Sequence, residues 1–184
     1  MNIASRHALT VDDYLAWAET QAEAKRTELI SGQIVPMSPE LVAHDRAKGS
    51  IYLALRRAIE SLDIEAEVFT TGITIPIESH TAYEPDASVR LGPRLPARDM
   101  KVPDPINVVE VLSPTSVHMD TSAKLIGYFK LPSVQHYLVL DPEARTVTHH
   151  TRGADDRISS QLLSAGRLRL DPPGIAIDIA DLFD

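Results

Sequence analysis

Cysteine is absent from the 184-residue sequence, which excludes disulfide bonds, thiolate metal sites and cysteine nucleophiles together. Also absent is any run near the roughly 20 apolar residues that a membrane helix requires. Residues 1–17 carry polar and acidic side chains where a secretory signal would have an apolar segment. We therefore expect a cytoplasmic protein that has no membrane-spanning segment.

Positive charge is scarce as well. The chain has 18 lysines and arginines against 26 aspartates and glutamates, for a formal net charge of −8. This balance disfavours a strongly basic nucleic-acid binder, because neutralisation of phosphates supplies most non-specific affinity. Carboxylates gathered around a metal ion contribute to the same count, yet the loaded site is locally positive. The net charge therefore does not exclude a metal-dependent enzyme.

The patterns that are present predict one α+β domain over residues 1–184, with 43% hydrophobic residues to fill its core. Helical spacing covers about 10–20, where Thr10 and Asp13 form a cap, then 43–62 and 118–131. Short β-branched runs predict strands in TELISGQIVPM, EVFTTGITIPIE, DASVRL, INVVEVL and QHYLVLDPEARTVTHHTR, and a last strand pair near 158–179. This order predicts a central mixed sheet with helices packed on it.

One carboxylate, Glu110, interrupts the apolar run 106–112. An ionised carboxylate in such a buried strand costs several kcal/mol unless it is paired. Asp86 opens the preceding strand, and consecutive strands are often neighbours, so the two carboxylates could share one ion. A hard cation such as Mg²⁺ or Mn²⁺ takes oxygen ligands, with the Val111 carbonyl as a third protein ligand. The alternative is that Asp86 caps a strand and Glu110 pairs with a nearby lysine or arginine.

Two further residues are candidates for the same site. Glu28 lies in a strand among apolar neighbours, where a lone glutamate is more often a solvated edge residue. Lys124 lies on the helix after Glu110, where its stem could follow the core while its ammonium reaches the carboxylates. A solvated surface lysine is the alternative.

Five stretches resemble, in this order, the Uma-two family of restriction-endonuclease-like proteins in the PD-(D/E)XK nuclease superfamily: TELISGQIVPMSP, EPDASV, NVVEVLSPTS, DTSAKLIGYF and QHYLVLDPEARTV. The resemblance runs from about 10 to 183. It implies a central mixed sheet flanked by helices and a catalytic set of Glu28, Asp86, Glu110 and a lysine. In the superfamily the lysine commonly stands two residues after the second acid, where this chain has Leu112. Lys124 matches a lysine moved to the following helix.

The resemblance implies a metal-dependent endonuclease that hydrolyses DNA phosphodiester bonds with Mg²⁺ or Mn²⁺, and we expect a homodimer because twofold assemblies are common. Two basic groups could contact phosphates or could be solvated: Arg90, Arg94, Arg98 and Lys101 between the acidic strands, and Lys48, Arg56 and Arg57 on the second helix. His44, which precedes that helix, could contact a phosphate or cap the helix. Two other functions remain open. One is a catalytically weak module that binds nucleic acid or protein, and the other is a phosphoesterase acting on small phosphorylated molecules.

Overall fold

The computed structural model describes residues 8–21, 26–112 and 121–183. The helices are α1 (Val11–Glu19), α2 (Val42–Glu60), α3 (Thr121–Phe129) and the 3-10 helix η1 (Ile179–Leu182). The strands are β1 (Thr27–Ile30), β2 (Gln33–Pro36), β3 (Ala66–Thr70), β4 (Ile75–Glu78), β5 (Thr81–Tyr83), β6 (Ala87–Leu91), β7 (Pro105–Val111), β8 (His136–Asp141), β9 (Thr146–Arg152), β10 (Ile158–Leu163), β11 (Arg167–Leu170) and β12 (Ile175–Asp178). Two stretches of the sequence analysis lie partly outside the described residues. They are the N-terminal segment, at residues 1–7, and the motif NVVEVLSPTS, whose end falls within residues 113–120.

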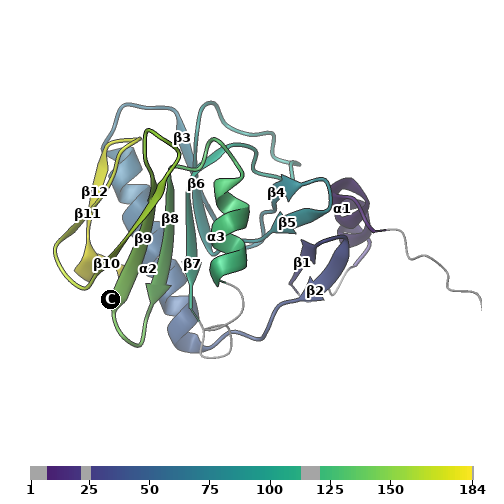
Figure 1. Cartoon of the computed structure of the whole chain (residues 1–184), viewed down its shortest axis with the longest axis horizontal. Helices are drawn as coiled ribbons and strands as arrows, with labels where there is room; N and C mark the ends of the chain where they lie inside the picture. The colour runs from purple at the N-terminus through teal and green to yellow at the C-terminus, as the bar shows by residue number, and fades with distance from the viewer. Residues whose placement is uncertain (1–7, 22–25, 113–120, 184) are drawn as a thin grey trace, which may run out of the picture.

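A six-stranded sheet in the order β10-β9-β8-β7-β6-β3 forms the centre, with α2 behind it and α3 in front of it (Figure 1). The β7–β8 pair is parallel, as expected for strands joined across a helix. The other neighbours in this sheet pair antiparallel. The predicted α+β fold, a mixed sheet flanked by helices, is therefore confirmed.

Strand β7 is buried on both faces because α2 covers one face of this sheet and α3 covers the other. On one face, Ile51 and Leu55 of α2 pack in a cluster with Val109. On the other face, Tyr128 of α3 packs in a cluster with Val108. This double burial explains the apolar run that Glu110 interrupts, and it places Glu110 on the α3 side of the sheet.

A second sheet, in the order β2-β1-β5-β4, lies to one side together with α1 (Figure 1). Its β1–β2 hairpin turns at Ser31 and Gly32, which both have positive φ, 50° and 76°, as a two-residue hairpin turn requires. Helix α1 begins at the predicted capping box of Thr10 and Asp13. Both local predictions are confirmed, and the hairpin carries Glu28 to Lys124 of α3.

The structure differs from the sequence prediction in three places. Strand β5 was missed because it is only three residues long, too short for a period to emerge. The expected strand pair near 158–179 is three strands: β10 extends the central sheet, and β11 and β12 form a separate hairpin. Strand β10 is exposed along nearly its whole length, so no alternation of burial marked it. Helix α2 begins at Val42, so His44 lies in its first turn and does not precede it.

A buried histidine pair on β8 and β9 should make stability depend on pH. His136 Nδ1 lies 2.9 Å from His149 Nε2, and burial, together with the charges of His136 and His150, lowers the pKa of His149 from 6.5 to about 4. Between these two pH values, the unfolded chain binds more protons at His149 than the folded chain does. The contribution of His149 to stability is therefore fully present above pH 6.5 and is lost as the pH drops towards 4. At about 1.4 kcal/mol per pH unit, His149 accounts for about 3 kcal/mol of that loss.

The free energy of unfolding of His149→Gln should therefore fall by about 3 kcal/mol less than that of the parent between pH 7 and pH 4. Glutamine is a neutral side chain that can still hydrogen-bond His136. Urea unfolding at the two pH values measures the difference, with the exposed His80→Gln as control. Equal losses in the parent and in His149→Gln would contradict the prediction.

Candidate active site

The predicted residues Glu28, Asp86, Glu110 and Lys124 come together where β1, the start of β6, the end of β7 and α3 meet. Glu28 is 4% exposed, Asp86 3% and Lys124 5%. Burial of several charged groups at one place is costly, and it points to function when the groups contact one another.

Lys124 connects two of the acids. Its Nζ lies 3.0 Å from Oε1 of Glu110 and 3.0 Å from Oε1 of Glu28. Helix α3 lies close enough for this contact because Gly127 has no side chain, and a Cβ there would lie 2.6 Å from Cε2 of Tyr83. Lys124 is thus a buried lysine, and the alternative of a solvated surface lysine does not describe it.

Glu110 and Glu28 resist ionisation. Burial raises the pKa of Glu110, and the negative charge of Asp86 raises it further. Lys124 and a hydrogen bond from the Tyr128 hydroxyl at 2.7 Å oppose this shift. Burial likewise raises the pKa of Glu28, and the negative charge of Glu110 adds to this shift, whereas Lys124 opposes it. One ammonium does not neutralise these acids, so a cation added here would relieve repulsion.

Asp86 faces the main chain of β7 on both sides of Glu110. Its backbone N–H donates to the Val109 carbonyl at 3.0 Å, and its Oδ2 accepts from the Val111 N–H at 2.8 Å. The hydrogen bond to Val111 is the strand-capping contact of the alternative interpretation. It also brings the Asp86 carboxylate beside Glu110, so the two interpretations are compatible.

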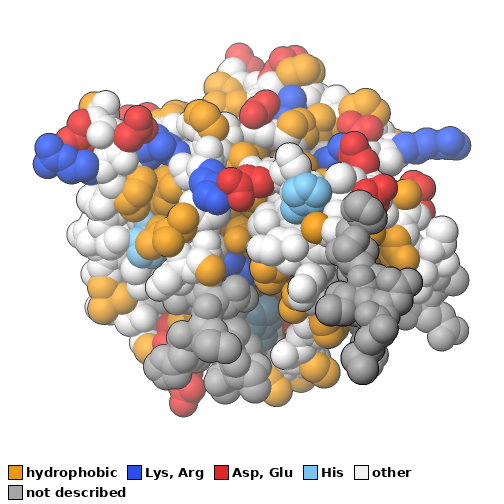
Figure 2. All heavy atoms as spheres, turned by 45° about the vertical axis from the view of Figure 1, so that its right-hand side comes forward, with side chains coloured by type: hydrophobic (Ala, Val, Ile, Leu, Met, Phe, Trp, Pro, Cys, Tyr) orange, Lys and Arg blue, Asp and Glu red, His pale blue; other side chains and the backbone are white. Residues whose placement is uncertain are grey.

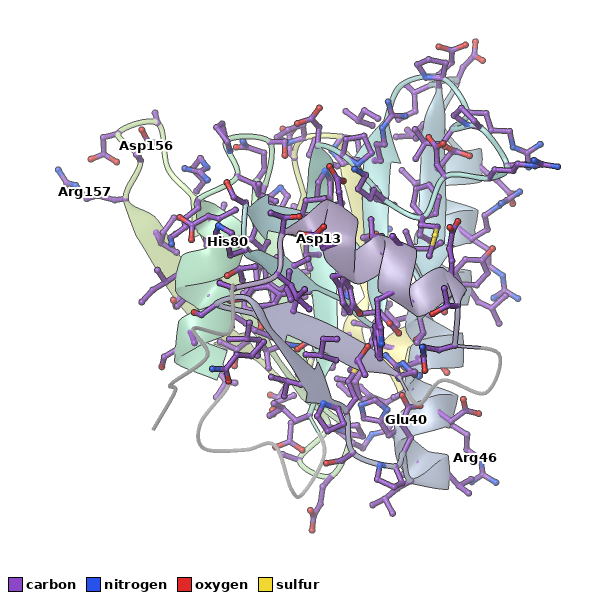
Figure 3. All side chains as sticks on the ribbon, turned by 90° about the vertical axis from the view of Figure 1, so that its right-hand side faces the viewer. Asp13, Glu40, Arg46, His80, Asp156 and Arg157 are labelled. Carbon is purple, nitrogen blue, oxygen red and sulfur yellow. The ribbon has the colours of Figure 1, made fainter. Side chains whose placement is uncertain are left out.

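A second group of charged residues surrounds the other side of Asp86. Glu40 pairs with Arg26, and Glu40 Oε2 lies 2.5 Å from Lys48 Nζ and 3.6 Å from His44 Nδ1. Glu40 lies at the N-terminal end of α2 (Figure 3). Sequence reasoning missed Arg26 and Glu40, although the spacing of Glu40, His44 and Lys48 at every fourth residue could have indicated one shared helical face.

The oxygen donors at the acidic centre fit a hard divalent cation. Asp86 and Glu110 supply carboxylates, and burial, followed by the negative charge of Asp86, raises the pKa of Glu110. The Val111 carbonyl accepts a hydrogen bond from His44 Nε2 at 2.8 Å and keeps a second lone pair. Among the described residues, ligand atoms of Glu40, His44 and Asp86 also lie within 4.8 Å of one another.

Arg90 and Arg94, the predicted substrate contacts, lie elsewhere. Arg90 stands four residues beyond Asp86 on β6, roughly 13 Å along the strand at about 3.3 Å per residue. It donates to the Pro93 carbonyl at 2.8 Å, and Arg94 is an exposed residue 3.7 Å from Glu67. The structure does not bring them to the acidic centre, and their contact with substrate stays a prediction.

The mixed sheet and the acid–lysine centre place the protein in the restriction-endonuclease-like class. The chain belongs to the Uma2 family, whose description is "Putative restriction endonuclease" and whose model matches residues 11–180. This confirms the family resemblance of the sequence motifs. Tyr128, which the motifs did not single out, joins the predicted residues through Glu110.

Known proteins that are similar to this chain include two relatives by sequence and one solved structure. The uncharacterized protein sll1609 of Synechocystis sp. is 28% identical, over 84% of this chain and 87% of its own length. The uncharacterized protein slr1290 of the same organism is 27% identical, over 93% and 90%. The crystal structure of a putative nuclease belonging to DUF820 from Anabaena variabilis has a TM-score of 0.74 and 18% identity, covering 95% of this chain and 97% of that chain, and it shows the shared fold. Within the described ranges, none of the helices is both long and apolar enough to span a membrane.

Proposed function

We propose that this protein is a metal-dependent endonuclease that hydrolyses DNA phosphodiester bonds with Mg²⁺ or Mn²⁺. The observation that carries the proposal is the buried Lys124 ammonium, 3.0 Å from both Glu28 and Glu110, beside the buried Asp86. Family membership supports a nuclease-like activity. The metal and the DNA substrate are our inference from the donor set and from that family.

Each residue has a distinct part in this proposal. Asp86, Glu110 and the Val111 carbonyl would hold the cation, which supplies Lewis-acid polarisation of the phosphoryl group and activation of water. The Lys124 ammonium, oriented by Glu28, would position the attacking water and offset charge that develops on the phosphate. Tyr128 fixes the Glu110 carboxylate through its hydroxyl.

The surface supports local recognition of phosphate over binding by a broad basic face. Figure 2 shows acidic and basic side chains interspersed over the described part of one face, without one continuous basic area. The net charge of −8 agrees with this distribution, and it also favours a second candidate, a phosphoesterase acting on small phosphorylated molecules. A pure binding module is less favoured, because a module has no need of buried acids. A cytoplasmic homodimer is part of the proposal.

Millimolar Mg²⁺ or Mn²⁺ should raise the melting temperature and allow cleavage of a DNA duplex. A cation at 100 times its dissociation constant adds about 2.7 kcal/mol to stability, or on the order of 5 to 10 °C for a chain of this size. Differential scanning fluorimetry against EDTA measures the shift, and gel electrophoresis of plasmid DNA measures cleavage. Metal stabilisation with turnover of p-nitrophenyl phosphate but not of DNA would favour the phosphoesterase. No metal stabilisation would favour the binding module.

A further inference from the structure

The Glu40 carboxylate is held by two cations, Arg26 and Lys48, with the His44 ring beside them; we call these three side chains the cationic cage. One of its oxygens pairs with Arg26 Nη1, and the other lies 2.5 Å from Lys48 Nζ and 3.6 Å from His44 Nδ1. Glu40 comes from the segment between β2 and α2, and its side chain is 26% exposed. It therefore enters this cationic cage from the surface, and it could leave the cage without disrupting the core.

The cage offers more donors than a carboxylate satisfies. Arg26 Nη2 is a buried donor without a hydrogen-bond partner among the described residues, and His44 Nδ1 in the same cage is buried and also lacks one. Each of the two oxygens of Glu40 already pairs with one cation, Arg26 or Lys48. A phosphodiester carries the same single charge on two anionic oxygens, but its tetrahedral group also presents two ester oxygens in other directions than a planar carboxylate does, and guanidinium groups bind phosphate oxygens in pairs.

The cage directly adjoins the acidic centre. Lys48 Nζ lies 3.8 Å and Arg26 Nη2 lies 3.9 Å from Oδ1 of Asp86. Glu84 accepts from Arg26 Nε at 2.6 Å, which orients the guanidinium towards the cage. A phosphate held in place of Glu40 would thus lie next to a carboxylate proposed to bind the cation.

A metal ion held by Glu40, His44 and Asp86 would use the same atoms, which lie within 4.8 Å of one another. The cations Lys48 and Arg26, both paired with Glu40, would repel such an ion at close range. They attract an anion for the same reason. The charge pattern favours an anion site at this position over a metal site.

We propose that Arg26, Lys48 and His44 form a subsite for a phosphodiester phosphate, and that Glu40 fills it in the free protein as an internal mimic which the substrate displaces. The substrate class rests on the nuclease function proposed above. Because DNA binds only when Glu40 has left the subsite, the apparent affinity equals the intrinsic affinity multiplied by the fraction of molecules in which Glu40 has left. Removal of the Glu40 charge should therefore strengthen binding.

The test compares Glu40→Gln with Glu60→Gln, which causes the same change in net charge at an exposed ion pair between Glu60 and Arg56 of α2. Binding of a fluorescein-labelled DNA duplex is measured by anisotropy in EDTA, so that neither metal nor cleavage contributes. If Glu40 fills the subsite in about nine of ten molecules, Glu40→Gln raises affinity about 10-fold. Glu60→Gln should change it by less than about 2-fold, as expected for a surface charge.

Equal affinities in Glu40→Gln and Glu60→Gln would overturn the proposal. A loss of Mn²⁺ stabilisation in Glu40→Gln would identify Glu40 as a metal ligand and would overturn it too. Should Glu40→Gln not fold, Lys48→Gln is compared with the exposed, charge-matched Arg57→Gln. A larger loss of DNA affinity in Lys48→Gln supports the subsite, and an equal loss refutes it.

Failure of the nuclease function has a different signature, because the parent would then neither bind nor cleave DNA. Inorganic phosphate is the probe in that case, with melting temperature as the measurement. A larger phosphate-induced rise in Glu40→Gln than in Glu60→Gln upholds the anion subsite without a DNA substrate. An equal rise overturns the subsite as well.

Discussion

Asp86→Asn and Glu110→Gln should each reduce metal-dependent DNA cleavage about 10³-fold or more, while the metal-free protein stays at least as stable as the parent. Each change removes a carboxylate proposed to hold the cation, whose contribution is several kcal/mol at about 1.4 kcal/mol per tenfold in rate. Stability is retained because either change removes the repulsion between the Asp86 and Glu110 carboxylates, and burial already disfavours the ionised form of Glu110. Initial rates on plasmid DNA and melting temperatures in EDTA measure the two effects.

The pH dependence of the metal-free protein provides a second readout. Because folding raises the pKa of Glu110 from 4.5, the folded state holds the proton more tightly than the unfolded chain. Stability should therefore be greatest below pH 4.5 for this group and should decline as the pH rises through the folded pKa. Glu110→Gln should flatten that decline. The exposed Asp63→Asn serves as control, and lower metal-free melting temperatures in both site variants would contradict a repulsive acidic centre.

Lys124→Ala should lower the rate of DNA cleavage by about 10²- to 10⁴-fold, as expected for a positioned group that acts on a water or proton. Its Nζ contacts Glu110 and Glu28 at 3.0 Å, but an ammonium is no metal ligand. Stabilisation by Mg²⁺ or Mn²⁺ should therefore persist in the variant. Single-turnover cleavage and the metal-dependent melting shift separate loss of catalysis from loss of metal.

Lys130→Ala is the matched control, because Lys130 follows the end of α3 and pairs with Glu78 at the surface, where both side chains are about half exposed. Its cleavage rate should equal that of the parent. Leu112 lies two residues after Glu110 and thus faces the same side of the strand. Leu112→Lys combined with Lys124→Ala should recover part of the lost rate. If Lys124→Ala alone cleaves as fast as the parent, Lys124 has no catalytic part.

Local patterns in the sequence were enough to locate most elements of this fold. The Thr10–Asp13 capping box set the start of α1, and the Ser31–Gly32 turn set the β1–β2 hairpin. The carboxylate in the apolar run of β7 indicated a buried acid that needs a partner. These signals are readable because caps, turns and side-chain periods depend on residues within a few positions of one another.

The identity of the contacts at the site was decided by the tertiary structure. The sequence named Lys124 and Glu110, but their distance follows from how closely α3 packs on Tyr83 beside Gly127. The pairing of Arg26 with Glu84, 58 positions apart, left no local pattern. Exposed β10 likewise joined the central sheet through its pairing with β9. Such contacts depend on which distant segments the core brings together, so composition and spacing along the chain do not encode them one residue at a time.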